Sequence, residues 1–373
     1  MLIRYGTNGK GRRVKIANIY TIEEHGITTG MIDSDALKII KRLRHGGYNA
    51  YVVGGAVRDL LLNKRPKDFD IATDAHPRQI KKLFWNAKII GKRFRLVHIQ
   101  FNNKIIEVST FRGLSPGDEQ NTFGTMEDDV KRRDFTFNAL YYSPIEEQLI
   151  DYISGYEDVR QARICSLIPL DVTFKEDPVR LIRTVKYAAT TGFPLPGKIK
   201  KALKKYSSEL EKAAVSRLTE ELMKILACGS SEQIFKYCIE YNMLQHIVPA
   251  VNDDITDGMM ESLRMLDKEI ADKESVRREY MIYALTRTYL TPPSQVSLKT
   301  KTAFREVFKA MKAVIAPLTP PNIEVEKAVV LYFKELGISI KIPNAHNTSK
   351  QRRSNRRRRP AHRKTKPPEQ AAR

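Results

Sequence analysis

Residues 51–70 read YVVGGAVRDLLLNKRPKDFD and contain the features that decide the fold. An apolar run stops at Gly54-Gly55 and a helical pattern resumes over residues 56–62, so the stretch predicts a strand, a glycine turn and a helix. Two glycines let the backbone approach a ligand closely, and the free N–H groups at the helix start suit a phosphate, which Arg58 could also contact. Taken alone, the same pattern also fits a tight turn with no ligand.

Two aspartates, Asp68 and Asp70, stand at the predicted strand that follows. Residues i and i+2 of a strand project to one face, so both carboxylates are expected side by side while Phe69 points into the core. A pair of divalent cations would explain such a pair, because Mg²⁺ prefers oxygen ligands and often shares them with substrate phosphates. The alternative for the pair alone is two solvated aspartates at the end of a strand.

The rest of the chain divides into two parts by pattern. Segments RLVHIQF (95–101) and IIEVSTF (105–111) alternate with period two and predict a hairpin through Asn102-Asn103. Strands and helices mix up to about residue 153, and almost only helical periodicity follows. We therefore expect an α/β head with a small mixed sheet, then an all-α helical array.

The formal net charge of +22 favours a polyanionic partner, because each neutralised phosphate releases counterions. From Ser349 onward the chain carries eleven Lys and Arg against the single acid Glu369, and it lacks the apolar residues of a core. This basic tail is expected to be disordered. The alternative for the charge as a whole is a solvated basic surface with no role in binding nucleic acid.

Several classes of protein are disfavoured by what the sequence lacks. No stretch approaches 18 apolar residues, so no transmembrane helix or membrane partner is expected, and the expected location is the cytoplasm. The three cysteines are odd in number and widely spaced, so they are expected to be reduced. The histidines show no spacing typical of a zinc site.

The motifs as a set resemble a known family. YVVGGAVRDLLLNKRPKDFDIAT (51–73) is similar to the head signature of the class II nucleotidyltransferases, the group of bacterial poly(A) polymerases and CCA-adding enzymes. The similarity continues through four later segments: FRLVHIQF (94–101), IIEVSTFRG (105–113), EDDVKRRDFTFNALYYSP (127–144) and FKEDPVRLIRTVKYAA (174–189). The resemblance implies transfer of nucleotides to an RNA 3′ end, with Mg²⁺ (or Mn²⁺) as cofactor and ATP as substrate.

The resemblance also implies roles for particular residues. Asp68 and Asp70 would hold the metals, and a third carboxylate would come from Glu107, favoured by strand geometry, or from Glu127. The remaining residues would contact the nucleotide: Gly54, Gly55 and Arg58 at the triphosphate, Arg133, Asp134 and Asn138 at the ribose and phosphates, and Asp177 and Arg180 at the base edge, with Arg183 and Lys186 nearby. Independently, a carboxylate and a guanidinium spaced three residues apart on a helix would match the amine and ring acceptor of adenine or cytosine.

Because the same pair matches both bases, it leaves two activities open. NKRPKDFD (63–70), FRLVHI (94–99), NALYYSP (138–144) and the Arg-rich tail look closer to the poly(A) polymerase branch, acting on mRNA and other transcripts. The alternative is CCA addition to tRNA, and a more remote one is a non-catalytic RNA-binding protein. The expected units are an N-terminal extension (1–30), a catalytic head (31–153), a base-recognition neck (154–230), an RNA-binding body (231–342) and the tail (343–373).

Overall fold

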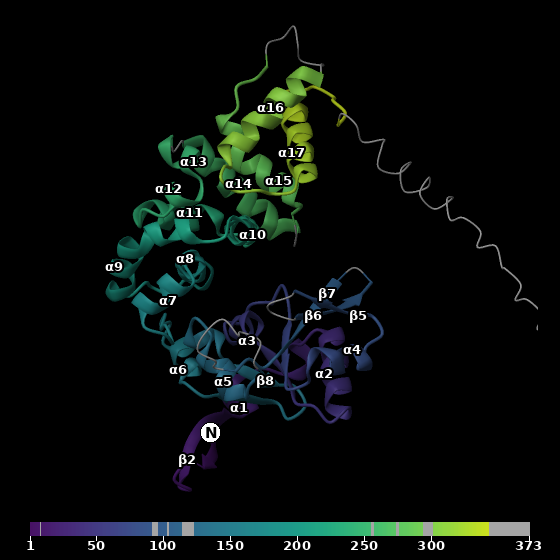
Figure 1. The fold of residues 1–373 in the computed structure, drawn as a ribbon, viewed down its shortest axis with the longest axis vertical. Helices are drawn as coiled ribbons and strands as arrows, with labels where there is room; N and C mark the ends of the chain where they lie inside the picture. The colour runs from purple at the N-terminus through teal and green to yellow at the C-terminus, as the bar shows by residue number, and fades with distance from the viewer. Residues whose placement is uncertain are drawn as a thin grey trace, which may run out of the picture.

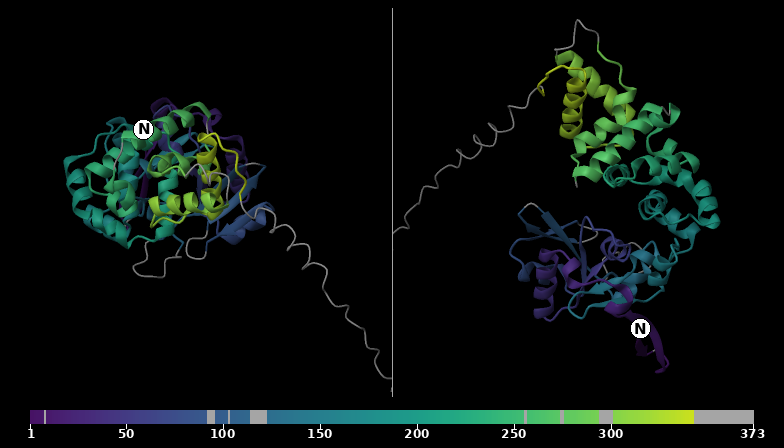
Figure 2. Two further views of the ribbon diagram at one scale, coloured as in Figure 1. Left: turned by 90° about the horizontal axis from the view of Figure 1, so that it is seen from above. Right: turned by 180° about the vertical axis from the view of Figure 1, so that it is seen from behind.

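The computed structural model describes residues 1–7, 9–91, 96–102, 104–113, 123–254, 257–273, 276–293 and 301–342. The predicted basic tail lies outside the described residues. The described chain forms an arc, with an α/β head at one end and helices that curve away from it (Figures 1 and 2). None of the described helices is both long and apolar enough to cross a membrane.

The head is built on one mixed sheet of nine strands in the order β1-β2-β9-β8-β3-β4-β7-β6-β5. The strands are β1 (Leu2–Thr7), β2 (Arg13–Tyr20), β3 (Ala50–Val53), β4 (Asp70–Thr73), β5 (Ala87–Ile90), β6 (Leu96–Phe101), β7 (Lys104–Thr110), β8 (Tyr141–Ser143) and β9 (Gln148–Asp151). β4 and β7 are parallel and the other neighbours are antiparallel. The sheet is larger than expected, because residues from the predicted N-terminal extension supply β1 and β2.

Helices cover both faces of the sheet. The head helices are α1 (Ile22–His25), α2 (Ser34–His45), α3 (Gly55–Leu61), α4 (Pro77–Leu83), α5 (Met126–Lys131) and α6 (Gly155–Arg160). Asp33 caps the start of α2, because its carboxylate accepts hydrogen bonds from two backbone N–H groups of the first turn. The helix buries Ile39 and Leu43 in the core under β3 and β4. The opposite face carries a smaller core that includes Tyr51, Val53 and Tyr141 and packs under α5.

The second half is helical, as expected. Its helices are α7 (Leu170–Glu176), α8 (Val179–Thr191), α9 (Gly197–Tyr206), α10 (Val215–Leu226), α11 (Ser231–Glu240), α12 (Leu244–Ile247), α13 (Pro249–Asp253), α14 (Asp257–Lys273), α15 (Arg278–Thr286), α16 (Lys301–Val314) and α17 (Asn322–Glu335). Amphipathic faces of α8, α10 and α16 bury leucine, valine and phenylalanine, and this core is continuous with that of the head.

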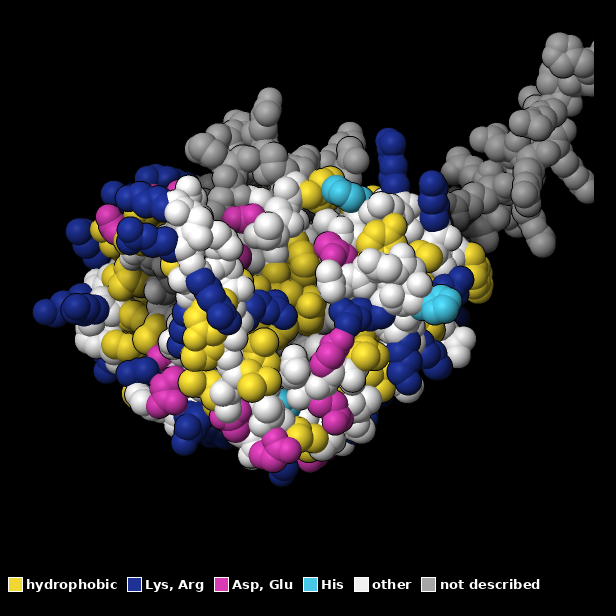
Figure 3. Space-filling view, turned by 90° about the horizontal axis from the view of Figure 1, so that it is seen from below, with side chains coloured by type: hydrophobic (Ala, Val, Ile, Leu, Met, Phe, Trp, Pro, Cys, Tyr) yellow, Lys and Arg dark blue, Asp and Glu magenta, His cyan; other side chains and the backbone are white. Residues whose placement is uncertain are grey.

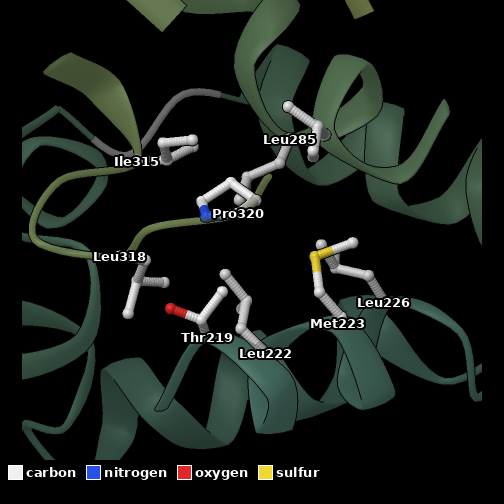
Figure 4. A pocket seen from close by; sticks show the side chains of 9 residues that line it. Thr219, Leu222, Met223, Leu226, Leu285, Ile315, Leu318 and Pro320 are labelled. Atoms are coloured by element: carbon white, nitrogen blue, oxygen red, sulfur yellow. The ribbon is translucent and has the colours of Figure 1, made fainter. Parts of the chain in front are cut away.

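A small cavity lies within the array, lined by apolar side chains of α10 and α15 and by Ile315, Leu318 and Pro320 (Figure 4). Its volume is about 10 Å³, about the room that one water molecule needs. It is therefore a packing defect and not a nucleotide pocket.

The surface at one end of the molecule carries charges of both signs. Viewed from the end where β1 and β2 project, Lys and Arg side chains lie interspersed with Asp and Glu (Figure 3).

The three cysteines are free thiols, of which Cys238 is buried.

Candidate active site

The glycine turn joins β3 to α3 as predicted. Gly54 has φ 70° and ψ −132°, a backbone conformation that residues other than glycine rarely adopt. A Cβ built on Gly54 would lie 3.5 Å from Nη1 of Arg133. The turn therefore brings bare backbone directly beside a guanidinium.

Asp70 is the first residue of β4 and pairs with Val53, the last residue before the turn. Asp68 lies two residues before Asp70, outside the strand, so the expectation that both sit on one strand is wrong for Asp68. On the other side of β4, the parallel pairing of Ile71 with Val108 sets Glu107 beside Asp70. The Asp68 and Glu107 side chains are exposed, and solvent also reaches Asp70, although the protein atoms packed around its carboxyl group leave it little hydration.

The electrostatics of Asp70 fit a site for a cation. Loss of hydration raises the pKa of Asp70 to about 6, and the carboxylates of Glu107 and Asp68 add to the rise. In the described residues, no three His, Cys, Asp or Glu side chains already surround a metal position. Such an incomplete oxygen set suits Mg²⁺, which commonly takes its remaining ligands from water and substrate phosphates.

This raised pKa predicts a dependence of stability on pH. Because the folded-state pKa exceeds the ordinary value of 3.8, ionised Asp70 destabilises the metal-free fold fully above pH 6 and not at all below pH 4. Asp70→Asn should therefore raise Tm in EDTA at pH 8 and leave it unchanged at pH 4, as measured by thermal melts. A lower Tm for the variant at pH 8 would show that Asp70 is a net stabilising charge.

The two candidates for the third carboxylate lie in different surroundings. The charge of Glu107 contributes to the raised pKa of Asp70, and Nε2 of His98 on β6 lies 3.2 Å from Oε1 of Glu107. Glu127 lies in the first turn of α5 and forms an i,i+4 ion pair with Lys131 at 2.7 Å. The geometry thus groups Glu107, and not Glu127, with the two aspartates.

Arg133 is held rigidly next to this group. Its Nη2 donates to the Asp129 carboxylate at 3.0 Å, its Nη1 donates to the Asn138 carbonyl at 2.9 Å, and its guanidinium lies 5.1 Å from the ring centre of Tyr141. The Tyr141 hydroxyl donates to the same Asp129 carboxylate. Asp129 and Tyr141 therefore fix a positive charge that acts on Asp70.

Arg58 lies in the first turn of α3, next to Gly55 of the glycine turn. Only 7% of it is exposed, and its guanidinium donates to Asp59 through Nε and Nη2 and to the Asn138 side chain through Nη1 at 2.9 Å. Its guanidinium also lies 5.1 Å from the ring centre of Tyr187 on α8. The structure therefore connects Arg58 with Asn138, close to Gly55 of the turn.

Two further predicted residues connect the head to α8. Nη2 of Arg183 lies 2.8 Å from Oδ2 of the buried Asp134 and donates to the Tyr187 hydroxyl at 2.9 Å. This charge contact links Asp134 of the head to α8, the helix that carries Arg180, although Oδ2 of Asp134 has no hydrogen-bond partner among the described residues.

The expected base-reading pair lies at the start of α8. Asp177 is the residue that follows α7, and Pro178 separates it from α8, so it does not share one helix with Arg180 as predicted. Its Oδ2 accepts from Arg217 of α10 at 2.9 Å, whereas its buried Oδ1 has no hydrogen-bond partner among the described residues. Arg180 donates to the Thr173 hydroxyl at 2.6 Å. An unpaired acceptor beside a guanidinium matches a base edge that offers an amine.

Lys186 connects α8 to α10. It forms an ion pair with Glu221 of α10, and both side chains are largely buried. Two lysines of the loop before Asp68 make similar links: Lys64 donates to the Thr190 carbonyl at 2.6 Å and Lys67 to the Ala227 carbonyl at 2.7 Å. These contacts fix the loop against the ends of α8 and α10.

Several residues of the site were missed by sequence reasoning. They are Lys67, Asp129, Tyr141, Arg217 and Lys224. The i,i+4 spacing of Asp129 and Arg133 was a readable signal. Lys67, Arg217 and Lys224 act on residues at least 40 positions away in the sequence. Tyr141 lies 12 residues after Asp129, a separation that matches no helix or strand period.

Comparison with known proteins identifies two regions of the chain. Residues 50–165 match the poly A polymerase head domain, and residues 192–255 match the "probable RNA and SrmB-binding site of polymerase A". Poly(A) polymerase I of Salmonella typhi is 36% identical over 287 residues, which are 70% of this chain and 62% of that protein. The chain belongs to the family of bacterial poly(A) polymerases and CCA-adding enzymes.

Other members of this family show how far the similarity extends. The Haemophilus influenzae poly(A) polymerase I is 32% identical over 72% of this chain and 64% of its own length, and the Leuconostoc citreum CCA-adding enzyme is 34% identical over 57% and 54%. The chain thus spans less than two thirds of these curated relatives. The solved Bacillus stearothermophilus CCA-adding enzyme in complex with CTP has the same fold, with 25% identity, a TM-score of 0.53, and coverage of 82% of this chain and 83% of that one.

Proposed function

We propose that the chain is a template-independent nucleotidyltransferase that adds AMP from ATP to RNA 3′ ends. The observation that carries the proposal is the group of Asp68, Asp70 and Glu107 beside the Gly54 turn and Arg133, on a poly A polymerase head. A set of carboxylates next to fixed donors for phosphate is the arrangement that phosphoryl transfer requires.

In this reaction the RNA 3′ oxygen bonds to the α-phosphorus of ATP, and the bond to the leaving pyrophosphate breaks. Asp68, Asp70 and Glu107 would hold Mg²⁺, which when bound neutralises phosphate charge and lowers the pKa of the attacking hydroxyl. The backbone at Gly54 and the guanidinium of Arg133 would bind the triphosphate from the other side. Because Arg133 is fixed by Asp129 and Tyr141, little reorganisation is needed when charge moves to pyrophosphate.

Poly(A) addition is favoured over CCA addition by the extent of the sequence match. The alignment with the Salmonella typhi poly(A) polymerase I runs over 287 residues, and that with the Leuconostoc citreum CCA-adding enzyme over 218. A test supplies either an unstructured RNA or a tRNA transcript that lacks its terminal CCA. Extension of both RNAs by many A residues supports the proposal. Addition of only C, C and A to the tRNA would replace it with the alternative.

The choice of base should depend on Asp177 and Arg180. Replacing either by Ala removes one partner of a base edge, which should shift the ATP to GTP preference by about 1–3 kcal/mol, or roughly 5–150-fold. The measurement is kcat/KM for each nucleotide with one RNA primer. Glu176→Ala, at the exposed neighbouring position, is the control and should keep the preference of the unmodified protein. An unchanged preference in both test variants would restrict the pair to a structural role.

A further inference from the structure

One stretch of the head is strongly basic. Between Asp74 and Glu107 there is no acidic residue, and the eight cationic ones are Arg78, Lys81, Lys82, Lys88, Lys92, Arg93, Arg95 and Lys104. Among those that the structure describes, Lys104 is held by Asp33 and Asp35 of α2. Arg78, Lys82 and Lys88 are exposed and form no ion pair with any described residue. Their positive charge is therefore available at the surface.

The only tryptophan of the chain lies in the middle of this stretch. Trp85 is 87% exposed, although it sits in the turn between α4 and β5. The turn itself is ordered: Phe84 is buried under Arg42, the Ala87 N–H donates to the Phe84 carbonyl at 3.2 Å, and Lys81 donates to the Trp85 and Ala87 carbonyls. An indole ring is thus presented to solvent by a fixed piece of backbone.

The register of the sheet relates this turn to the candidate active site. Lys88 pairs with His98, and His98 pairs with Glu107, so one row across the sheet leads from β5 to the carboxylates. Three strand spacings of about 4.8 Å separate β5 from β4, which puts Lys88 roughly 14 Å from Asp70. β5 begins at the end of the sheet where β4 begins, because β4 and β7 are parallel and β5 is aligned with β7 through β6. Trp85 therefore lies at the same end of the sheet as Asp70.

We propose that Trp85, Arg78, Lys82 and Lys88, together the Trp85 corner, bind single-stranded RNA upstream of the 3′ end being extended. A base would stack on the indole, and the three cations would neutralise the flanking phosphates. Stacking on exposed aromatic side chains combined with a basic surface is how proteins bind single strands without sequence preference. The inference rests on the proposed function for the identity of the polymer, and charge complementarity favours RNA over a protein partner.

Because Trp85 is the only tryptophan, its fluorescence reports on the corner in the full-length protein. Titration with oligoadenylate should quench the emission, since the base stacks on the ring, whereas inorganic polyphosphate of equal charge should not. Equal quenching by polyphosphate, or binding of oligoadenylate in a mobility-shift assay without any quenching, would overturn the proposal. A change in emission with protein concentration alone would also overturn it, in favour of contact between two copies of the chain.

Variants separate stacking from charge. Trp85→Ala should raise the KM for RNA by about 5–150-fold, with a much smaller effect on kcat, and Trp85→Phe should restore most of the affinity.

Arg78→Ser with Lys82→Ser should lower the slope of log K for RNA binding against log salt by about 1.4, at about 0.7 per phosphate contact. Arg13→Ser with Lys15→Ser removes the same charge from exposed positions of β2, near the edge of the sheet opposite to β5, and is the matched control. Unchanged RNA affinity in Trp85→Ala would refute the corner.

The two proposals can fail separately. If oligoadenylate quenches Trp85 but no nucleotide is added, the corner stands and the proposed activity falls. If nucleotides are added and Trp85→Ala behaves as the unmodified protein, the activity stands and the corner falls.

Discussion

Asp70→Asn is expected to lower the rate of nucleotide transfer by about 10³-fold or more, the loss expected when a metal ligand at the reacting phosphate is removed. The substitution keeps the size of the side chain and removes the charge that a divalent cation needs. Asp70 lies at a solvent-exposed strand start and not in the core, so the fold should persist. The measurement is single-turnover extension of a labelled RNA at saturating ATP and Mg²⁺, with circular dichroism to verify folding.

Two companion variants sharpen this result. Glu107→Gln should also lose most activity, because Glu107 lies next to Asp70 across the β4–β7 pairing. Glu127→Gln is the control, since Glu127 is engaged by Lys131 on the surface of α5, and it should remain nearly as active as the unmodified protein. Loss of activity in Glu127→Gln with full activity in Glu107→Gln would exchange their assignments. More than a few per cent of activity in Asp70→Asn would refute the metal site.

Lys186→Met is expected to destabilise the fold by about 3–5 kcal/mol, because it leaves the carboxylate of Glu221 buried without its partner. The pair joins α8 to α10, so the loss falls on the contact between the helix that carries Arg180 and the helical array. Chemical denaturation at pH 7, followed by circular dichroism, measures the free energy of unfolding.

The double variant Lys186→Met with Glu221→Leu separates structure from nucleotide binding. Replacing both members by apolar residues of similar size should recover most of the stability. If Lys186 serves only this ion pair, the double variant should also recover its KM for ATP. A KM that stays raised in a stable double variant would show that Lys186 contacts the nucleotide, as the resemblance implied.

Local features of the sequence predicted the centre of the head well. The strand, glycine turn and helix around Gly54 follow from backbone preferences within a dozen residues. The hairpin of β6 and β7 follows from its period of two. The same reasoning failed for Asp68, because strand propensity alone does not fix the residue at which pairing begins.

Features that depend on long-range pairing could not be predicted in the same way. The grouping of Glu107 with Asp70 arises from the register of β4 against β7, and the contact of Asp177 with Arg217 joins residues 40 apart in the chain. Likewise, residues 2–20 looked like a separate extension in the sequence. Their place in the sheet depends on the pairing of β2 with β9, more than a hundred residues later, which no local pattern indicates. The exposure of Trp85 also depends on how its turn is held in the folded chain.

The proposed addition of AMP to RNA is tested by incubating the purified protein with a 5′-labelled unstructured RNA, Mg²⁺ and each nucleoside triphosphate separately. We expect a long ladder of products with ATP, little extension with the other three nucleotides, and none with ATP in Asp70→Asn. Absence of extension with every nucleotide, or equal ladders with all four, would contradict it.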